Sequence, residues 1–184
     1  MMMSRIDSLA LIETSLWQEL QLAAQQPGHE WRTLALGTVQ GGEAQVRTVV
    51  LREVDAAAHE LVFFTDARSA KVAQMQAQPI GALLCWSSRL SWQLRLRVAL
   101  DVQSSGLKVS SCWARLKLTP AAQDYLSPLP PGSPVTEPYE PQRASREHFA
   151  VVSARVLSID WLELHADGHR RARFSPDGAQ WLQP

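Results

Sequence analysis

The sequence predicts a mainly β domain with a few helices inserted between the strands. Its clearest signal is residues 91–103, where apolar and polar side chains alternate as on a strand with one buried face. Two further strand-like segments, 31–39 and 44–54, are joined across the hairpin-type dipeptide Gly41-Gly42. About seven strands are expected in all, and sequential antiparallel strands of this number most naturally close into a small barrel.

An N-terminal helix is predicted within residues 1–28. Apolar side chains recur there at helical spacing until Pro27-Gly28 ends the run. The segment carries Asp7 and Glu13 among its apolar residues and lacks a small-residue cleavage site, so we do not expect a secretory signal peptide.

The remaining elements follow from shorter patterns. Residues 80–86 form a continuous apolar run, which predicts a strand buried on both faces. A short helix is predicted at 69–78, with Ser69 as its cap and Pro79 as its stop. The other expected elements are strands at 61–65, 149–164 and 169–174, a short piece around Trp181, and helical segments between Gly106 and Leu126, in which Thr119 caps and Pro120 takes the first helical position.

The composition is that of a single globular domain spanning residues 1–184. Lys+Arg and Asp+Glu are both 18, so the charge balance indicates neither a nucleic-acid nor a membrane partner. No apolar run approaches the roughly 20 residues that span a bilayer. The two cysteines are too few for a disulfide framework, and we expect a cytoplasmic protein. Residues 127–141 hold six prolines and one glycine, which predicts a surface loop that continues to residue 143.

Common hydrolytic and metal-binding motifs are missing from the sequence. It contains no HExxH, CxxC, GxSxG or GxxxxGK[ST] motif. The five histidines show no ligand spacing on a common helix face. We therefore predict no metal site and assign no catalytic residue.

Two arginines on an otherwise apolar strand are the unusual feature of the sequence. Arg47 and Arg52 bracket the apolar run of strand 44–54, and an arginine in or beside a strand core needs an anionic partner. That partner is either an acidic neighbour such as Glu53 or Asp55, or a bound anion. The residues alone leave both alternatives open.

A phosphate site is suggested by the segment that follows. The strand ending at Asp66 leads into a predicted helix whose start carries Ser69 and Lys71. A helix N-terminus offers free backbone N–H groups, to which these side chains add a hydroxyl and an ammonium. With Arg47 nearby in a barrel, these groups form a site for a phosphate dianion. On strand 91–103, Gln93 and the two arginines that follow it on the same face, Arg95 and Arg97, form a polar face that suits a planar heterocycle.

Taken in order, five motifs resemble those of the pyridoxamine 5′-phosphate oxidase family. The resemblance runs from about residue 31 to the C-terminus. It implies a homodimer of FMN-binding split β-barrels, with each FMN in a cleft between the two subunits. The motifs are R-T-V-V-L-R (47–52), F-F-T-D (63–66), S-A-K (69–71), W-Q-L-R-L (92–96) and H-R-R-A-R-F (169–174).

The resemblance also implies which residues surround the FMN. Arg47 and Lys71 would hold its phosphate, and the last residues of strand 61–65 would hold the ribityl-phosphate end. Gln93 would reach the flavin ring from the partner subunit, and Arg173 matches a C-terminal arginine that touches the cofactor. The full cofactor-binding set is Arg47, Thr48, Val49, Val50, Leu51, Arg52, Phe64, Thr65, Ser69, Lys71, Gln93 and Arg173.

The substrate side departs from the family pattern. The family's phosphate-binding helix begins Ser-Arg-Lys, whereas this chain has Ser69-Ala70-Lys71 and lacks one cation. Arg52 stands where the oxidases carry a lysine that faces the substrate. The oxidases hold the substrate phosphate with a Tyr, an Arg and a Ser from the helical insertion and with a later Arg-x-His. The corresponding substrate-binding candidates here are Arg52, Trp113, Lys117, His169 and Arg171, a pattern closer to the oxidase-related branch.

Two functions follow from the resemblance. The first is an FMN-dependent oxidoreductase, in which the flavin takes a hydride from a small anionic substrate and passes electrons to an acceptor such as O₂. Pyridoxamine or pyridoxine 5′-phosphate is one such substrate. The alternative is a non-catalytic FMN-binding protein for storage or sensing, which the altered substrate clamp favours.

Overall fold

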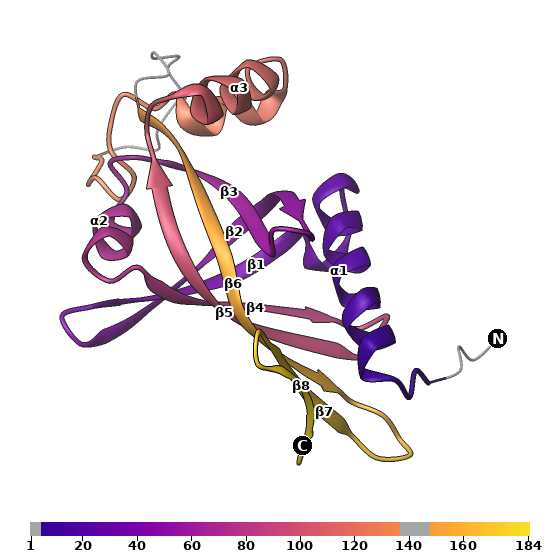
Figure 1. The fold of residues 1–184 in the computed structure, drawn as a ribbon. Helices are drawn as coiled ribbons and strands as arrows, with labels where there is room; N and C mark the ends of the chain where they lie inside the picture. The colour runs from indigo at the N-terminus through magenta and orange to yellow at the C-terminus, as the bar shows by residue number, and fades with distance from the viewer. Residues whose placement is uncertain (1–4, 137–147) are drawn as a thin grey trace.

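The computed structural model describes residues 5–136 and 148–184, which form one antiparallel sheet with helices around it (Figure 1). Residues 137–143 of the predicted proline-rich loop lie outside the described residues, and 127–136 contain neither helix nor strand. The strands are β1 (Thr33–Gln40), β2 (Glu43–Asp55), β3 (Glu60–Asp66), β4 (Ile80–Ser87), β5 (Trp92–Gln103), β6 (Phe149–Glu163), β7 (Arg170–Ser175) and β8 (Gly178–Leu182).

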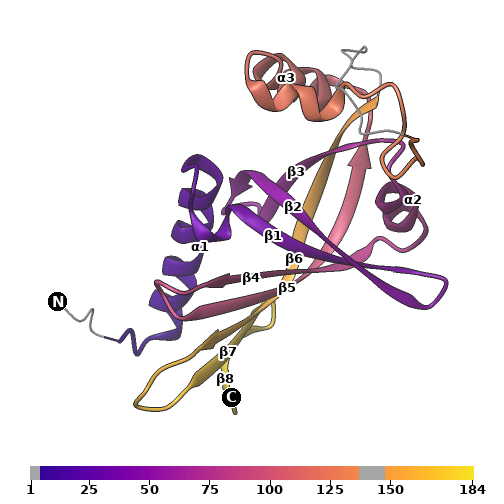
Figure 2. The same ribbon diagram turned by 180° about the vertical axis from the view of Figure 1, so that it is seen from behind.

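The described strands are ordered β3-β2-β1-β4-β5-β6-β7-β8. An additional pairing of β3 with β6, in which Phe63 lies opposite Val152, closes β1–β6 into a ring. The hairpin β7–β8 continues from β6 and projects beyond the ring (Figures 1 and 2). The ring creates one inner and one outer face, and every strand presents alternate residues to them.

The N-terminal helix precedes the strands and the other helices are inserted between them, as the sequence predicts. α1 (Leu9–Gln25) packs against β2, and α2 (Ala70–Ala77) packs against β1 and β5. α3 (Leu107–Leu116) and the 3₁₀ turn η2 (Pro120–Tyr125) form a lobe at the end of β6 opposite the β7–β8 hairpin (Figure 1). In the described part of the chain, no helix is long and apolar enough to cross a membrane.

Two hydrophobic clusters hold these layers together. The main cluster fills the ring and includes the apolar stripe of α1, with Trp31, Phe63 and Trp161 fully buried. The second cluster lies between the α3–η2 lobe and the outer faces of β3 and β6, where Trp113 and Tyr125 both pack on Phe149. Burial of apolar surface on this scale is the dominant stabilising term in folding.

Three expectations about local structure need correction. The run 80–86 is not buried on both faces, because the side chains of Leu84 (41% exposed) and Trp86 (43% exposed) point away from the ring. Trp31 belongs to a 3₁₀ turn (η1, Glu30–Arg32), so the first strand begins at Thr33. Ser69 and Thr119 stand at N-cap positions, but neither side chain makes a capping hydrogen bond.

Candidate functional site

The structure excludes one of the two alternatives for the arginines of β2 within the described residues. Glu53 forms an ion pair with Arg115 of α3, and Asp55 accepts the backbone N–H of Ala58 in the β2–β3 turn. Within residues 5–136 and 148–184, neither Arg47 nor Arg52 has a carboxylate partner. In the described residues, the two arginines are therefore not paired with an acidic neighbour.

Arg47 lies on the inner face of β2, at the end of the ring that α2 covers. Its Nη1 donates to Thr38 Oγ1 and to the carbonyl of Gln45 at 3.2 Å, and its Nη2 donates to Gln74 Oε1 at 2.8 Å. Burial lowers the pKa of Arg47, although the guanidinium stays protonated at any ordinary pH. These contacts hold a charged group in place without neutralising it.

Lys71 of α2 lies beside this arginine. Its Nζ donates to Thr65 Oγ1 at 2.9 Å and to Ser69 Oγ at 2.7 Å. Burial, and then the positive charge of Arg47, lower the pKa of Lys71, while Asp66 acts in the opposite direction. The cluster formed by Arg47, Thr65, Ser69 and Lys71 is called the cradle below.

The cradle has hydrogen-bond donors left for a ligand. Arginine carries five N–H donors, and the contacts of Arg47 leave its Nε–H and one Nη2 hydrogen without an acceptor among the described residues. One ammonium N–H of Lys71 and the hydroxyl hydrogen of Ser69 are likewise available. At the start of α2, the backbone N–H groups of Ala70 and Lys71 have no acceptor among the described residues, whereas that of Val72 donates to the Ser69 carbonyl. Two cations and a set of donors suit a phosphate, whose oxygens only accept.

Arg68 does not replace the cation that Ala70 lacks. Its guanidinium forms an ion pair with Asp66 at 2.6 Å and donates to the carbonyls of Ser127 at 2.8 Å and Pro128 at 3.0 Å. Through these hydrogen bonds, Arg68 instead connects the start of the proline-rich segment to the turn between β3 and α2, next to the cradle. The positive charge of the cradle therefore comes from Arg47 and Lys71.

Arg52 lies on the other face of β2, next to the α3–η2 lobe. Its guanidinium carbon is 5.7 Å from the centre of the Phe64 ring, and its buried Nε has no acceptor in the described structure. Burial raises the pKa of Tyr125, whereas the neighbouring Arg52 lowers it. A buried donor of this kind is costly unless a ligand completes its hydrogen bonding.

Gln93 and Arg173 lie away from the cradle in the single chain. Gln93 is on the outer face of β5, three strands from β2, whereas Arg47 points to the inner face. Arg173 lines an open groove of about 660 Å³ on the outer faces of β5, β6 and β7, together with Arg95 and Asp160. One chain therefore does not bring all the predicted cofactor-binding residues together.

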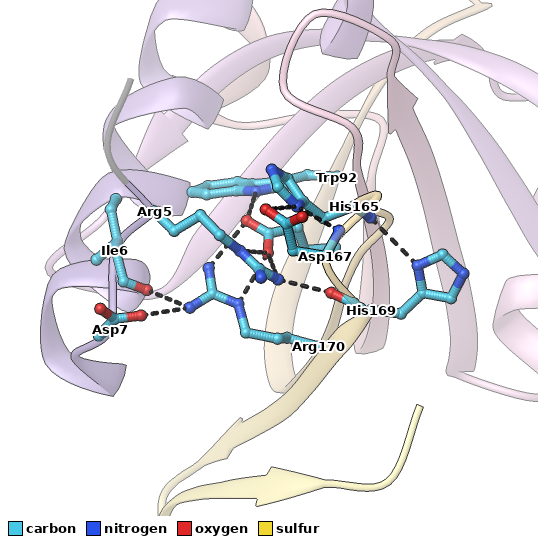
Figure 3. Close-up of polar contacts among 10 residues, drawn as sticks. Arg5, Ile6, Asp7, Trp92, His165, Asp167, His169 and Arg170 are labelled. Carbon is cyan, nitrogen blue, oxygen red and sulfur yellow. Dashed lines mark hydrogen bonds and ion pairs between the residues drawn. The ribbon is translucent and has the colours of Figure 1, made fainter. Parts of the chain in front are cut away.

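The predicted substrate residues are also divided between two places. Trp113 is packed in the second cluster and Lys117 follows the last turn of α3, both in the lobe. Arg171 forms an ion pair with Asp160 at 2.7 Å, and His169 Nδ1 accepts the backbone N–H of His165 at 3.2 Å (Figure 3). These two lie toward the β7–β8 hairpin, at the opposite end of β6, so their role toward a substrate stays a prediction.

Sequence reasoning missed two residues that contact Arg47, namely Thr38 and Gln74. Thr38 is 3% exposed and Gln74 is 5% exposed, and both are polar. The position of Gln74 three residues after Lys71 could have suggested that one face of α2 carries both. No local pattern could have indicated that Thr38 of β1 reaches the same point.

Comparisons with known proteins identify the family to which the chain is similar. Residues 14–104 match the model of a family described as "Pyridoxamine 5'-phosphate oxidase, FMN-binding domain", a range that contains the whole cradle. A pyridoxine/pyridoxamine 5′-phosphate oxidase from Nostoc sp. (strain PCC 7120) is 33% identical over 91 residues, which are 50% of this chain and 41% of that protein. The match thus spans less than half of that relative.

Two solved structures resemble nearly the whole chain. One is a pyridoxamine 5′-phosphate oxidase-related, FMN-binding protein from Nostoc punctiforme, with 24% identity and a TM-score of 0.71, covering 99% of this chain and 100% of that one. The other is PhzG from Burkholderia lata 383, solved with tetrahydrophenazine-1-carboxylic acid, with 16% identity and a TM-score of 0.72, covering 95% and 92%. At these identities the likeness concerns the fold.

Proposed function

Because this chain belongs, through its FMN-binding domain at residues 14–104, to the pyridoxamine 5′-phosphate oxidase family, we propose that it is an FMN-dependent oxidoreductase acting on a small anionic substrate. The observation that carries the proposal is the cradle, where Arg47 and Lys71 have no carboxylate partner among the described residues and keep donors for a phosphate. We assign the FMN phosphate to this point and a cytoplasmic location to the protein.

The functional unit we propose is a homodimer of split barrels. Its interface would include the outer face of β4, where Leu84 and Trp86 are exposed in the single chain. Trp86 lies directly opposite Gln93 on β5, so a partner packing on this face would also meet Gln93. A second copy would bring Gln93 and Arg173 to the FMN whose phosphate lies in the cradle of the first. Sedimentation should therefore give a dimer, and a monomer that binds FMN tightly would contradict this arrangement.

Within this site the protein supplies binding and orientation. When bound, FMN supplies the hydride-transfer chemistry. Arg52, with its buried Nε lacking an acceptor in the described structure, would bind an anionic group of the substrate and orient it. Trp113, Lys117, His169 and Arg171 remain candidates for the same task. Pyridoxamine or pyridoxine 5′-phosphate is the first substrate to test.

A non-catalytic FMN-binding protein is the second candidate. The observation that favours it is the ion pair between Arg171 and Asp160, to which Arg95 also binds at 2.7 Å. An arginine with this partner is less available to a substrate anion than Arg47 is to a phosphate. In this alternative the protein binds FMN but catalyses no reaction.

The absorbance spectrum of the purified protein tests the proposal. We expect a yellow protein that releases FMN on denaturation. Anaerobic mixing with pyridoxamine 5′-phosphate should bleach the flavin if this compound is the substrate, and persistent colour with a panel of small anionic substrates would favour the binding protein. A colourless protein that also fails to bind added FMN would rule out both functions.

FMN binding should weaken as the pH rises. The pKa of Lys71 is lowered chiefly by burial, so its ammonium begins to lose its proton below the usual range, and the neutral amine attracts a phosphate dianion less strongly. The dissociation constant for FMN should therefore begin to increase at a pH below the ordinary lysine pKa of about 10.4. In Lys71→Met the affinity should be lower at the outset and its pH dependence flatter. Riboflavin, which has no phosphate, serves as the control, and equal pH profiles for the two proteins would contradict the assignment.

A further inference from the structure

Gln74 and Thr38 form a polar contact between α2, β1 and β2 at the cradle. Gln74 Oε1 accepts from Thr38 Oγ1 at 2.6 Å and from Arg47 Nη2 at 2.8 Å, while Thr38 Oγ1 accepts from Arg47 Nη1. The amide nitrogen of Gln74 donates to Gln40 Oε1 at 2.8 Å. Both terminal nitrogens of the Arg47 guanidinium are thus held by neutral side chains.

We propose that Gln74 and Thr38 are positioning residues, which aim the Arg47 guanidinium at the cofactor phosphate and so set the preference for FMN over flavins without a phosphate. This inference rests on the proposed function and deepens it. It concerns residues that touch neither the phosphate nor the reacting atoms, and that act through Arg47.

The directions of these hydrogen bonds support a positioning role. Thr38 gives its only hydroxyl hydrogen to Gln74, so its oxygen can only accept from Arg47. Gln74 presents its carbonyl oxygen to Arg47 because its amide end is occupied by Gln40. Each partner therefore offers an acceptor to the cation, and the guanidinium plane is fixed on one side while Nε–H and one Nη2 hydrogen remain for a ligand.

The neutrality of both partners matters as much as their geometry. A carboxylate at either position would hold Arg47 just as firmly but would cancel the charge that attracts a phosphate. Thr38 and Gln74 are almost fully buried, so they hold the guanidinium where water competes little. A side chain already ordered in the free protein loses less conformational entropy when the ligand binds.

α2 couples this arrangement to the second cation. Lys71 and Gln74 are three residues apart and lie on one face of the helix. Lys71 reaches Thr65 and Ser69, while Gln74 reaches Arg47, so a single eight-residue helix sets the position of both charges. A shift of α2 would move the two together.

A purely structural role for this network would give a different result from a positioning role. If Gln74 and Thr38 only attach α2 to the ring, their loss would lower stability and weaken binding of all flavins alike. If they aim Arg47, their loss would weaken FMN binding while riboflavin binding stays unchanged. The decisive quantity is therefore the ratio of the riboflavin and FMN dissociation constants, measured alongside the melting temperature.

The test compares wild type with Gln74→Met, Gln74→Glu, Thr38→Val and Thr38→Ser, and uses Arg47→Ala as the reference for complete loss. We expect Gln74→Met and Thr38→Val each to lower the ratio about tenfold, the equivalent of one charged hydrogen bond. Gln74→Glu should lower it further, because the carboxylate pairs with Arg47. Thr38→Ser keeps the hydroxyl and should restore the wild-type ratio.

The outcomes separate this inference from the function on which it rests. A wild-type protein that binds riboflavin as tightly as FMN would show that the cradle does not bind the phosphate, and would overturn both. A large wild-type ratio that Arg47→Ala abolishes but Gln74→Met and Thr38→Val leave unchanged would overturn the positioning role alone. If Gln74→Met fails to fold, the pair Thr38→Val and Thr38→Ser decides.

Discussion

Arg47→Ala should weaken FMN binding by about 1.5–3 kcal/mol, which is roughly a 10- to 150-fold increase in the dissociation constant. The guanidinium is held beside Lys71 and has no carboxylate partner among the described residues, so its charge is available to the phosphate. Removing it eliminates charge-assisted hydrogen bonds to the ligand and leaves the buried Gln74 Oε1 with one donor fewer. Titration of the apoprotein with FMN, followed by flavin fluorescence, measures the change.

A matched surface arginine provides the control for this prediction. Arg89 is exposed in the β4–β5 turn and forms an ion pair with Glu19 at 2.6 Å. Arg89→Ala removes the same side chain and charge away from the cradle, and FMN affinity should stay at the wild-type level. Lys71→Ala should weaken binding on the same scale as Arg47→Ala. Unchanged affinity in both cradle variants would mean that the phosphate binds elsewhere.

Glu163→Ala should lower the free energy of unfolding by about 3 kcal/mol, the scale for breaking a buried ion pair. The Glu163 side chain is 8% exposed and binds two arginines, Arg5 Nη2 at 2.7 Å and Arg170 Nε at 2.8 Å. Both arginines are labelled in Figure 3. Burial opposes its ionisation, but the hydrogen bonds from Arg170 and Arg5 hold the pKa of Glu163 below its usual value. Arg170 also lies against Trp161, so the alanine variant would remove its buried partner next to the core and leave it only the exposed Asp7 among the described residues.

Asp7→Ala is the matched control for this ion-pair network. Asp7 binds Arg170 at a similar distance, 2.8 Å, but its side chain is 88% exposed, so the variant should cost less than about 1 kcal/mol. Chemical denaturation of the wild type, Glu163→Ala and Asp7→Ala measures the three free energies of unfolding. Because the pKa of Glu163 is lowered in the folded state, its contribution is present at neutral pH and is lost as the pH falls through that pKa. A Glu163→Ala variant as stable as Asp7→Ala would contradict the prediction.

Much of the local structure could be predicted from the sequence because its signals are local. The alternation along 91–103 predicted β5, and the dipeptide Gly41-Gly42 predicted the turn between β1 and β2. The cradle was also within reach, because Thr65, Ser69 and Lys71 are close in sequence, and a strand end leading into a helix start places them together. The ordered motifs supplied the family and its cofactor, which the family comparison bears out.

Other features depend on residues that meet only in the folded chain. The pairing of β3 with β6 closes the ring, but no pattern within either strand specifies that partner. The apolar run 80–86 was read as a strand buried on both faces, since periodicity records that a side chain is apolar and not which neighbour covers it.

Whether Arg47 pairs with an acid or stays available to an anion was open in the sequence, because Glu53 and Asp55 are its neighbours in the chain. The fold directs Glu53 to Arg115 and Asp55 to a turn, and brings Thr38 and Gln74 to Arg47. Periodicity and turn residues thus determined the elements and the order of the motifs, whereas the choice of electrostatic partners, made between strands and helices far apart in the chain, was decided by the tertiary structure.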